Sequence, residues 1–247
     1  MTDGVDADAP GTDHQGVTAD SGRGRTVSVD AHVHTAASFD ATTTPEQLLA
    51  AASDTDLDAL VVTDHDTMEG ARVASSLAIE ADPLVIEGCE VSTADGHLLA
   101  IGIDRTPQPG LPLADTVRSV RDQGGVAVVP HPFQRSRHGV AAGAIDDVDG
   151  LEVANAQTLT GVRNTQAERF ATRESHAAFG GSDSHSPASV GAAATAVDLP
   201  PGDPLSEASV LDAMRAGHTS AVTGRVSALC YLDRIVTNAT LKTYSVF

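Results

Sequence analysis

The stretch VDAHVHTAASFD, residues 29–40, ends a short apolar run with two histidines and nearby carboxylates. Side chains two positions apart in a strand point to the same face, so His32 and His34 share a side. A metal ion needs such a shared face, and Asp40 follows closely in the sequence. A polar turn after a strand explains an isolated pair of this kind equally well. The rest of the chain must therefore decide what these residues do.

Short apolar runs and helical patterns alternate from residue 26 onward. The expected strands cover residues 26–33, 59–63, 84–87, 98–103, 126–129, 151–154 and 178–181, with a small one at 219–224. Helices are expected after Thr44, which starts a capping box, and from Asp66, which we expect to cap its helix. Three more are expected at 113–123, 164–174 and 206–217. This order predicts an α/β fold with a mostly parallel sheet, open or closed into a barrel.

The length of 247 residues suits one domain, which we place at residues 26–225. Residues 1–25 contain almost no large apolar side chain and are expected to form a disordered acidic tail. Residues 226–247 are treated as a C-terminal extension of uncertain structure. No apolar run approaches the ~20 residues that span a bilayer, and the N-terminus lacks a secretory pattern. We expect a cytoplasmic protein without membrane contact. Its two cysteines, Cys89 and Cys230, are too few for a disulfide framework.

The charge balance is strongly acidic, with a net charge of −19 from 34 acidic and 15 basic residues. Such a field repels a nucleic-acid backbone, which argues against duplex binding. High salt would screen the self-repulsion of the chain. We therefore hypothesise a salt-loving source with a saline cytoplasm.

Polar side chains collect where the predicted strands end or begin. In parallel α/β folds the functional site forms at the carboxyl ends of the strands. Six of the ten histidines stand at such positions beside carboxylates, which a structural role explains poorly. The candidate ligands are His32, His34, Asp40, His65, Glu90, His97, His131, Asp183 and His185.

Imidazole and carboxylate ligands together suit zinc, manganese or iron. Nine candidates are too many for one ion, so two or three divalent ions bridged by a carboxylate are expected. A carboxylated lysine provides the bridge in some barrel hydrolases, but the only lysine here is Lys242, close to the C-terminus. The bridge must then be an acidic side chain, and Glu90 is the best candidate.

The motifs DAHVHT, TDHD, GCEVS, PHPF and GSDSH, in this order, resemble those of the PHP (polymerase and histidinol phosphatase) family of metal-dependent phosphoesterases. The resemblance spans residues 27–197. It implies a distorted (β/α)7 barrel with a trinuclear metal site at the carboxyl ends of the strands. Matched motif by motif, it implies a first ion held by His32, His34, Glu90 and Asp183, a second by Asp40, His65 and His185, and a third by His97 and His131, with Glu90 shared between the first and the third.

Residues beside the candidate ligands suggest supporting roles. Asp30 and Asp64 could accept the free ring N–H of a ligating histidine, although turn formation would also explain them. Arg135 and Arg137 follow His131 in HPFQRSRHG, and guanidinium groups bind phosphate oxygens bidentately. We take both as candidates for substrate binding, against the alternative of a solvated loop. His138 could protonate the leaving group.

The expected function is hydrolysis of a small phosphomonoester by a metal-bound hydroxide. No serine lies in a nucleophile-elbow pattern, in agreement with attack by water. Substrates of the resembled family include nucleotides and histidinol phosphate, and the sequence does not choose between them. Two alternatives stay open. One is an amidohydrolase-like enzyme that cleaves C–N bonds, and the other is a non-catalytic, metal-binding regulatory module. The oligomeric state stays open as well.

Overall fold

The computed structural model describes residues 24–78, 83–158 and 160–224, in which nine strands form one sheet. The strands lie in the order β7-β6-β5-β4-β3-β2-β1-β8-β9. Their bounds are β1 Arg25–Val33, β2 Ala59–Val62, β3 Leu84–Thr93, β4 Gly96–Ile101, β5 Val126–Val129, β6 Gly150–Asn155, β7 Ala177–Gly181, β8 Ala194–Leu199 and β9 Thr219–Val222.

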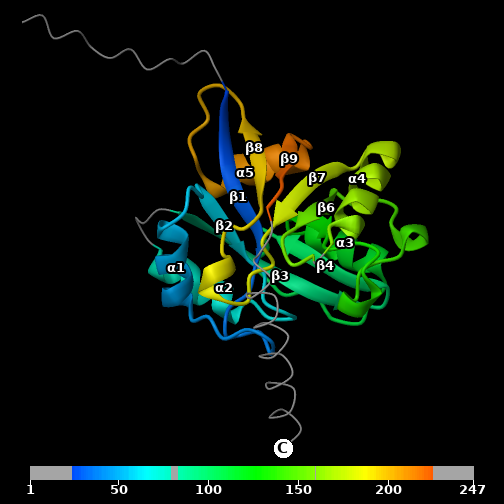
Figure 1. The fold of residues 1–247 in the computed structure, drawn as a ribbon, viewed down its shortest axis with the longest axis horizontal. Helices are drawn as coiled ribbons and strands as arrows, with labels where there is room; N and C mark the ends of the chain where they lie inside the picture. Colours follow the sequence, from blue (N-terminus) through cyan, green and yellow to red (C-terminus); the bar gives the residue numbers. More distant parts are fainter. Residues whose placement is uncertain (1–23, 79–82, 159, 225–247) are drawn as a thin grey trace, which may run out of the picture.

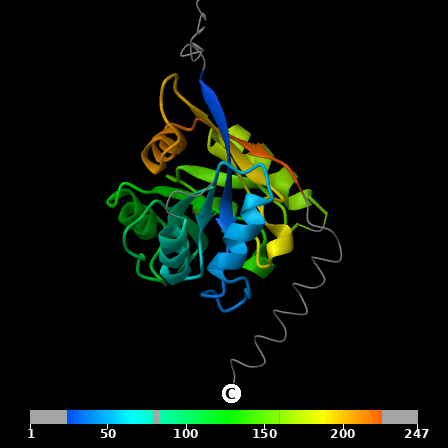
Figure 2. The same ribbon diagram turned by 90° about the vertical axis from the view of Figure 1, so that its left-hand side faces the viewer.

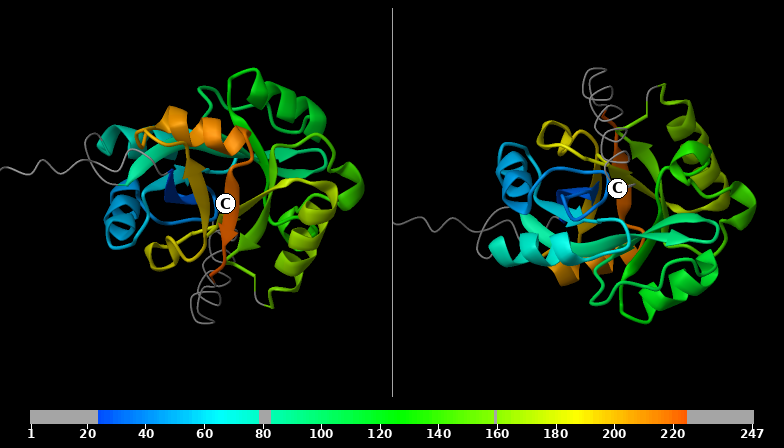
Figure 3. Two further views of the ribbon diagram at one scale, coloured as in Figure 1. Left: turned by 90° about the horizontal axis from the view of Figure 1, so that it is seen from above. Right: turned by 90° about the horizontal axis from the view of Figure 1, so that it is seen from below.

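The sheet curls into a nearly closed barrel, with helices around its outside (Figures 1 and 3). The helices are α1 Pro45–Ser53, α2 Glu69–Leu77, α3 Leu113–Arg121, α4 Val162–Glu174 and α5 Glu207–Arg215. The ends of the sheet meet because β7 contacts β8 and β9. At this seam the hydroxyl of Thr195 accepts the Gly180 N–H and donates to the Gly180 carbonyl, at 2.9 and 2.8 Å. The predicted α/β barrel is therefore confirmed, with nine strands in place of seven.

The interior of the barrel is filled by apolar side chains. Val27 and Val29 of β1 pack there with residues of β2 to β5, and α5 closes one end through Val210 and Met214. Figure 2 shows α5 near the end of the barrel where β1 begins. Strands β2, β5 and β6 are buried on both faces, as expected when a sheet has a core inside and helices outside. The opposite end of the barrel is left for polar side chains.

Three strands of this sheet differ from the prediction. β4 runs antiparallel to both β3 and β5, because β3 and β4 form a hairpin in which Thr93 pairs with Gly96. β8, which pairs antiparallel with β1, was not expected. β3 also extends to Thr93, so Glu90 lies within the strand and not after it. Because β4 is reversed, its first residues lie at the carboxyl end of the neighbouring parallel strand.

The helix starts are confirmed in part. Thr44 forms the expected capping box with Gln47, and Ser206 caps α5. The expectation for Asp66 was wrong. α2 begins only at Glu69, and the Asp66 carboxylate accepts the backbone N–H of Ser92 at 2.7 Å. Asp66 thus links the segment that precedes α2 to β3.

Parts of the sequence prediction lie outside the described residues. The expected tail does so except for Gly24 and Arg25, of which Arg25 already begins β1. The expected extension at 226–247 does so entirely. Within the described part of the chain, no helix has the length and apolarity that crossing a membrane requires.

Candidate metal centre

The nine candidate ligands converge at one end of the barrel. Their nitrogen and oxygen atoms form four overlapping groups, each compact enough to surround one ion. The groups are His34–Asp40–His65–His185, His32–His34–Glu90, His32–His131–Asp183 and His65–Glu90–His97. Eight of the nine side chains are at most 9% exposed, and the ninth, His97, is 12% exposed. Because the groups share members, the nine side chains form one connected cluster and not several separate ones.

A shift in strand register aims the histidines of β1 into this site. The pairing of β1 with β2 is irregular between Asp30 and Val33, and such a bulge changes the direction of the following side chains. Val29 therefore packs in the barrel interior, whereas His32 and His34 join the ligand cluster. Their Nε2 atoms lie 3.0 Å apart.

The Nδ1 atoms of these two histidines make hydrogen bonds that hold the rings in place. His32 Nδ1 lies 3.1 Å from Glu152 Oε1, and His34 Nδ1 lies 3.1 Å from Ser38 Oγ. The single hydroxyl proton of Ser38 is donated to Asp64 at 3.0 Å, so Ser38 Oγ accepts a hydrogen bond from the Nδ1–H group of His34. In both rings the bond at Nδ1 turns Nε2 toward the site, which is the orientation that metal binding through Nε2 requires.

Glu90 lies between two sets of histidines. Its Oε2 is 3.2 Å from Nε2 of both His32 and His34. Its Oε1 is 2.7 Å from His97 Nδ1 and 3.1 Å from His131 Nε2. A carboxylate with one oxygen toward each set has the geometry of a bridging ligand.

Asp40 lies close to two further histidines of the cluster. Its Oδ2 lies 3.1 Å from His185 Nε2 and 3.5 Å from His65 Nε2. His185 Nδ1 donates to the carbonyl of Asp183 at 2.8 Å, which again leaves Nε2 toward the site. Two of the ligands, His131 and Asp183, have positive φ angles of 30° and 51°. This backbone conformation costs a non-glycine residue free energy, and such strain is common at functional sites.

Burial and close charges shift the pKa values of the cluster in opposite directions. Burial alone would lower the pKa of His32, but Glu90 and Glu152 raise it to about 9. Burial, followed by the nearby Arg137, lowers the pKa of His131 to about 3. Despite burial, the surrounding imidazoles hold the pKa of Glu90 and of Asp40 far below the usual range. Both carboxylates are therefore ionised at neutral pH.

The chemistry of these residues fits divalent metal ions. Buried imidazole nitrogens and carboxylate oxygens form the donor set that zinc, manganese and iron accept. Two donors of the cluster, Asp40 Oδ1 and His65 Nδ1, are buried and make no hydrogen bond with the described residues. A buried polar atom of this kind costs free energy unless something else binds it. An ion would satisfy both.

Sequence reasoning missed Glu152 and Asn155 of β6. Besides its contact with His32, Glu152 accepts the backbone N–H of His131 at 2.7 Å through Oε2. The Asn155 amide donates to Glu152 and to Asp183, at 2.8 and 3.0 Å. A signal was present, because Glu152 is a charged residue inside an otherwise apolar predicted strand. Glu152 takes the position beside a histidine ring that we expected for Asp30.

The two aspartates expected to support the ligands have different contacts. Asp30 accepts backbone N–H groups of Ser182 and Gly191, at 2.8 and 2.9 Å, and so ties β1 to the chain beyond β7. Burial raises its pKa to about 6. Asp64 reaches the ring of His34 through Ser38.

The loop after β5 brings one of its two arginines to the cluster. Arg137 forms an ion pair with Asp183 and donates to Asn155 Oδ1 at 3.0 Å. Arg135 is exposed. His138 is exposed as well, and its ring stacks on that of His97 with 5.1 Å between the ring centroids.

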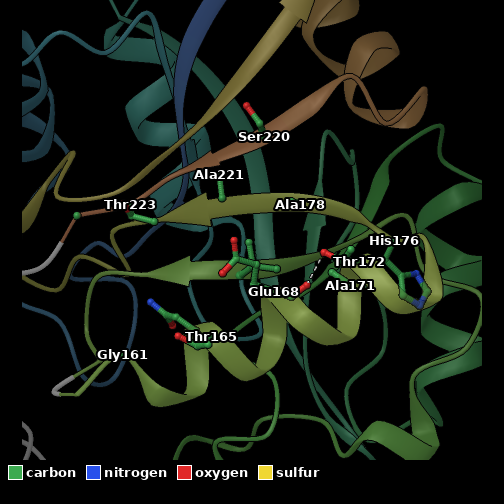
Figure 4. A pocket seen from close by; sticks show the side chains of 13 residues that line it. Gly161, Thr165, Glu168, Ala171, Thr172, His176, Ala178, Ser220, Ala221 and Thr223 are labelled. Carbon is green, nitrogen blue, oxygen red and sulfur yellow. Dashed lines mark hydrogen bonds between the residues drawn. The ribbon is translucent and has the colours of Figure 1, made fainter.

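A separate cavity of about 650 Å³ lies between α4 and the strands β7 and β9. In Figure 4, Thr165 and Glu168 of α4 and Ala221 of β9 border the same space. None of the nine candidate ligands is among the residues that line it.

The profile of the PHP domain matches residues 30–180, which contain seven of the nine candidate ligands. The chain belongs to the PHP domain family. A second profile, of the PHP-associated region, matches residues 161–219. The PHP match runs from the end of β1 through most of β7, and the second match runs from α4 to the start of β9.

Three known proteins resemble this PHP chain. An uncharacterized protein of Methanocaldococcus jannaschii is 28% identical over 152 residues, 57% of this chain and 89% of that protein. A two-domain Bacteroides vulgatus protein containing a predicted PHP-like metal-dependent phosphoesterase has a TM-score of 0.67 at 20% identity, covering 89% of this chain and 71% of that one. A Chromobacterium violaceum amidohydrolase, solved with sulfate and without metal, has a TM-score of 0.52 at 18% identity, over 83% and 96% of the two chains. At these identities the two structures show a shared fold alone.

Proposed function

We propose that this PHP chain hydrolyses a small phosphomonoester with the help of two or three divalent metal ions. The observation that carries the proposal is the position of Glu90, whose two carboxylate oxygens face separate sets of histidines. A site of several ions with one bridging carboxylate is suited to phosphoryl transfer, in which charge spreads over several oxygens. When bound, the ions would supply that charge neutralisation and lower the pKa of a water molecule.

The residues of the chain have distinct tasks in this proposal. All nine candidate ligands hold the ions, and Glu152, Ser38 and Asp64 fix the orientation of the histidines of β1. Arg137, with Arg135 beside it, binds the phosphate oxygens that do not react. As water adds to phosphorus and the bond to the ester oxygen breaks, the departing oxygen needs a proton. His138, exposed at the rim, is the candidate donor.

A small ester is favoured over a nucleic acid. The net charge of −19 opposes the approach of a polyanion. A nucleotide and histidinol phosphate both remain candidate substrates, and a cytoplasmic location agrees with either of them.

Hydrolysis of a C–N bond is the alternative enzymatic function. We retain it because the fold resembles that of the C. violaceum amidohydrolase. The third possibility, a non-catalytic regulatory module, is opposed by the complete set of nine ligands.

A release assay separates the three functions. Protein loaded with manganese, zinc or iron is incubated with a panel of phosphomonoesters and, separately, of amides and cyclic ureides. We expect inorganic phosphate from at least one ester. Release of ammonia or a ring-opened product alone would favour the amidohydrolase, and inactivity on both panels with a full metal complement would favour the regulatory module.

A further inference from the structure

Four rings form a row along the edge of the metal centre. Phe39 stacks on His65, with 4.9 Å between the centroids and 24° between the planes. His65 meets His97 edge-on at 5.0 Å, and His97 stacks on His138 at 5.1 Å. The two inner rings face Glu90, from which His65 Nδ1 lies 3.4 Å and His97 Nδ1 2.7 Å away. The row thus passes the candidate bridge and ends on each side in an exposed ring.

Phe39 is the unusual member of this row. It is 63% exposed, whereas Phe133, Phe170 and Phe179 are 8, 9 and 0% exposed. A single exposed apolar side chain is common on protein surfaces. Here, however, the inner face of the ring is covered by a candidate ligand, and the outer face is open directly beside the reactive centre.

The backbone around Phe39 is fixed on both sides. Ser38 is buried and bonded to Asp64, and its Oγ also accepts the backbone N–H of His65 at 3.0 Å. Asp40 is buried among the candidate ligands. A ring held in this way loses little conformational freedom when a ligand stacks on it, so it is preorganised for binding.

The two ends of the row differ in charge. His138 lies next to Arg137 in the chain, and with Arg135 these residues make one end cationic. Phe39 is apolar and uncharged. A phosphate ester bound with its phosphorus near Glu90 would place anionic oxygens toward the arginines and an apolar leaving group toward Phe39.

We propose that Phe39 is the surface on which a planar aromatic ring of the leaving group stacks, which makes esters such as nucleoside monophosphates the preferred substrate class. This inference rests on the proposed phosphoesterase function. Stacking between a base and an aromatic side chain is favourable and tolerates different bases, because every base has a π face. The ring of Phe39 would accordingly select for a planar group and not for one particular base.

The kinetic test compares two substrates that differ only in the base, adenosine 5′-monophosphate and ribose 5-phosphate. In metal-loaded Phe39→Ala, kcat/KM for the nucleotide should fall about 5- to 100-fold, the range for loss of one stacked base, with little change for ribose 5-phosphate. Phe39→Tyr retains a ring and should keep the preference for the nucleotide. Leu77→Ala, which removes a side chain of α2 that is 46% exposed, is the matched control and should change neither rate. An equal effect of Phe39→Ala on both esters, or none on either, would overturn the inference.

A binding test works without catalysis. The chain contains no tryptophan, so Phe39→Trp introduces a single indole whose fluorescence reports on the rim. Adenosine, which has the base but no phosphate, should quench this fluorescence with a saturable dependence, and ribose should not. If the wild-type protein hydrolyses no phosphomonoester of the panel but adenosine quenches the indole, the proposed function fails and the ring site stands. If esters are hydrolysed but adenosine leaves the fluorescence unchanged at millimolar concentrations, the ring site is wrong.

Discussion

Glu152 holds His32 in place: its Oε1 lies 3.1 Å from His32 Nδ1, and both side chains are fully or almost fully buried. The other oxygen of Glu152 accepts the backbone N–H of His131. One carboxylate therefore positions candidate ligands from β1 and from the loop after β5. Hydrogen bonds of this kind orient a ligating ring and raise its basicity.

Glu152→Gln should weaken metal binding without unfolding the protein. The amide can still accept a hydrogen bond from His32, but the negative charge that makes the ring more basic is lost. We expect about a 10- to 100-fold loss of metal affinity, as for other partners of ligating histidines. Competition with a fluorescent chelator measures it. Glu168→Gln makes the same change on the exposed face of α4 and should have no effect. Equal affinities for the two variants would show that Glu152 does not orient the ligand.

Glu90→Gln should remove at least one metal equivalent and most of the activity. An amide cannot bridge two cations as a carboxylate does, and we expect a loss on the order of 10³-fold in turnover by analogy with other groups that stabilise charge in the transition state. Cys89→Ser is the control, because Cys89 points into the apolar core on the other face of β3. Metal stoichiometry and turnover are measured for both. Retention of every ion and of normal rates by Glu90→Gln would place the bridge on another residue.

Arg137→Ala should lower kcat/KM about 10- to 100-fold, the value of a charge-assisted bidentate contact. Arg135→Ala should have a smaller effect, since Arg135 is exposed whereas Arg137 reaches Asp183 and Asn155. Arg163 of α4, also exposed, serves as a control. Because Arg137 pairs with a candidate ligand, metal content is determined for each variant. Unchanged kinetics in Arg137→Ala with full metal content would exclude Arg137 from substrate binding.

Removing the metal should abolish activity and lower the melting temperature. The ions bind the folded state, so at a free concentration of 100 times Kd each contributes about 2.7 kcal/mol to the free energy of unfolding. Prolonged dialysis against a strong chelator, followed by calorimetry and a phosphate assay, measures both effects. Manganese, zinc or iron should restore them. Full activity in protein shown by elemental analysis to lack metal would contradict the proposed function.

Added KCl should stabilise the protein. With a net charge of −19, repulsion between surface carboxylates opposes the folded state, and salt screens it. Thermal unfolding is followed from dilute buffer to molar KCl, and the melting temperature should rise over this range. A protein that is most stable and most active in dilute buffer would contradict the hypothesis of a saline cytoplasm.

The candidate site could be predicted best where histidines and carboxylates stand at the ends of predicted strands. His32 and His34 share a face at the end of a strand, and most of the other candidate ligands follow a predicted strand, so their convergence was expected from the rule for parallel sheets. His97 joined them for a reason that the sequence did not reveal. The hairpin of β3 and β4 has the turn residues Ala94 and Asp95, which lack the Asn-Gly signal typical of two-residue turns.

The unpredicted parts depend on tertiary contacts. β8 has the short sequence ATAVDL, whose alanines give little strand signal, and it is a strand because β1 and β9 pair with it. Glu152 lies in a strand that is otherwise apolar, and only the fold shows that its buried carboxylate faces His32. The direction of Arg137 likewise follows from the loop conformation and not from the spacing HPFQRSR.

The candidate ligands are widely separated along the chain, and this has a consequence for how the proposed metal centre would acquire its ions. Asp183 and His185 leave the ribosome long after His32 and His34, and they reach the cluster only when β7 has joined β6. A nascent chain therefore offers an incomplete set of donors, and loading must follow folding. Protein sites tend to bind the divalent metals in the same order of affinity, and the choice of ligands changes this order only in part. The ion found in a purified sample will depend on the metal supply of the growing cells as well as on the protein, so growth media of defined metal content should precede any assignment of the native ion.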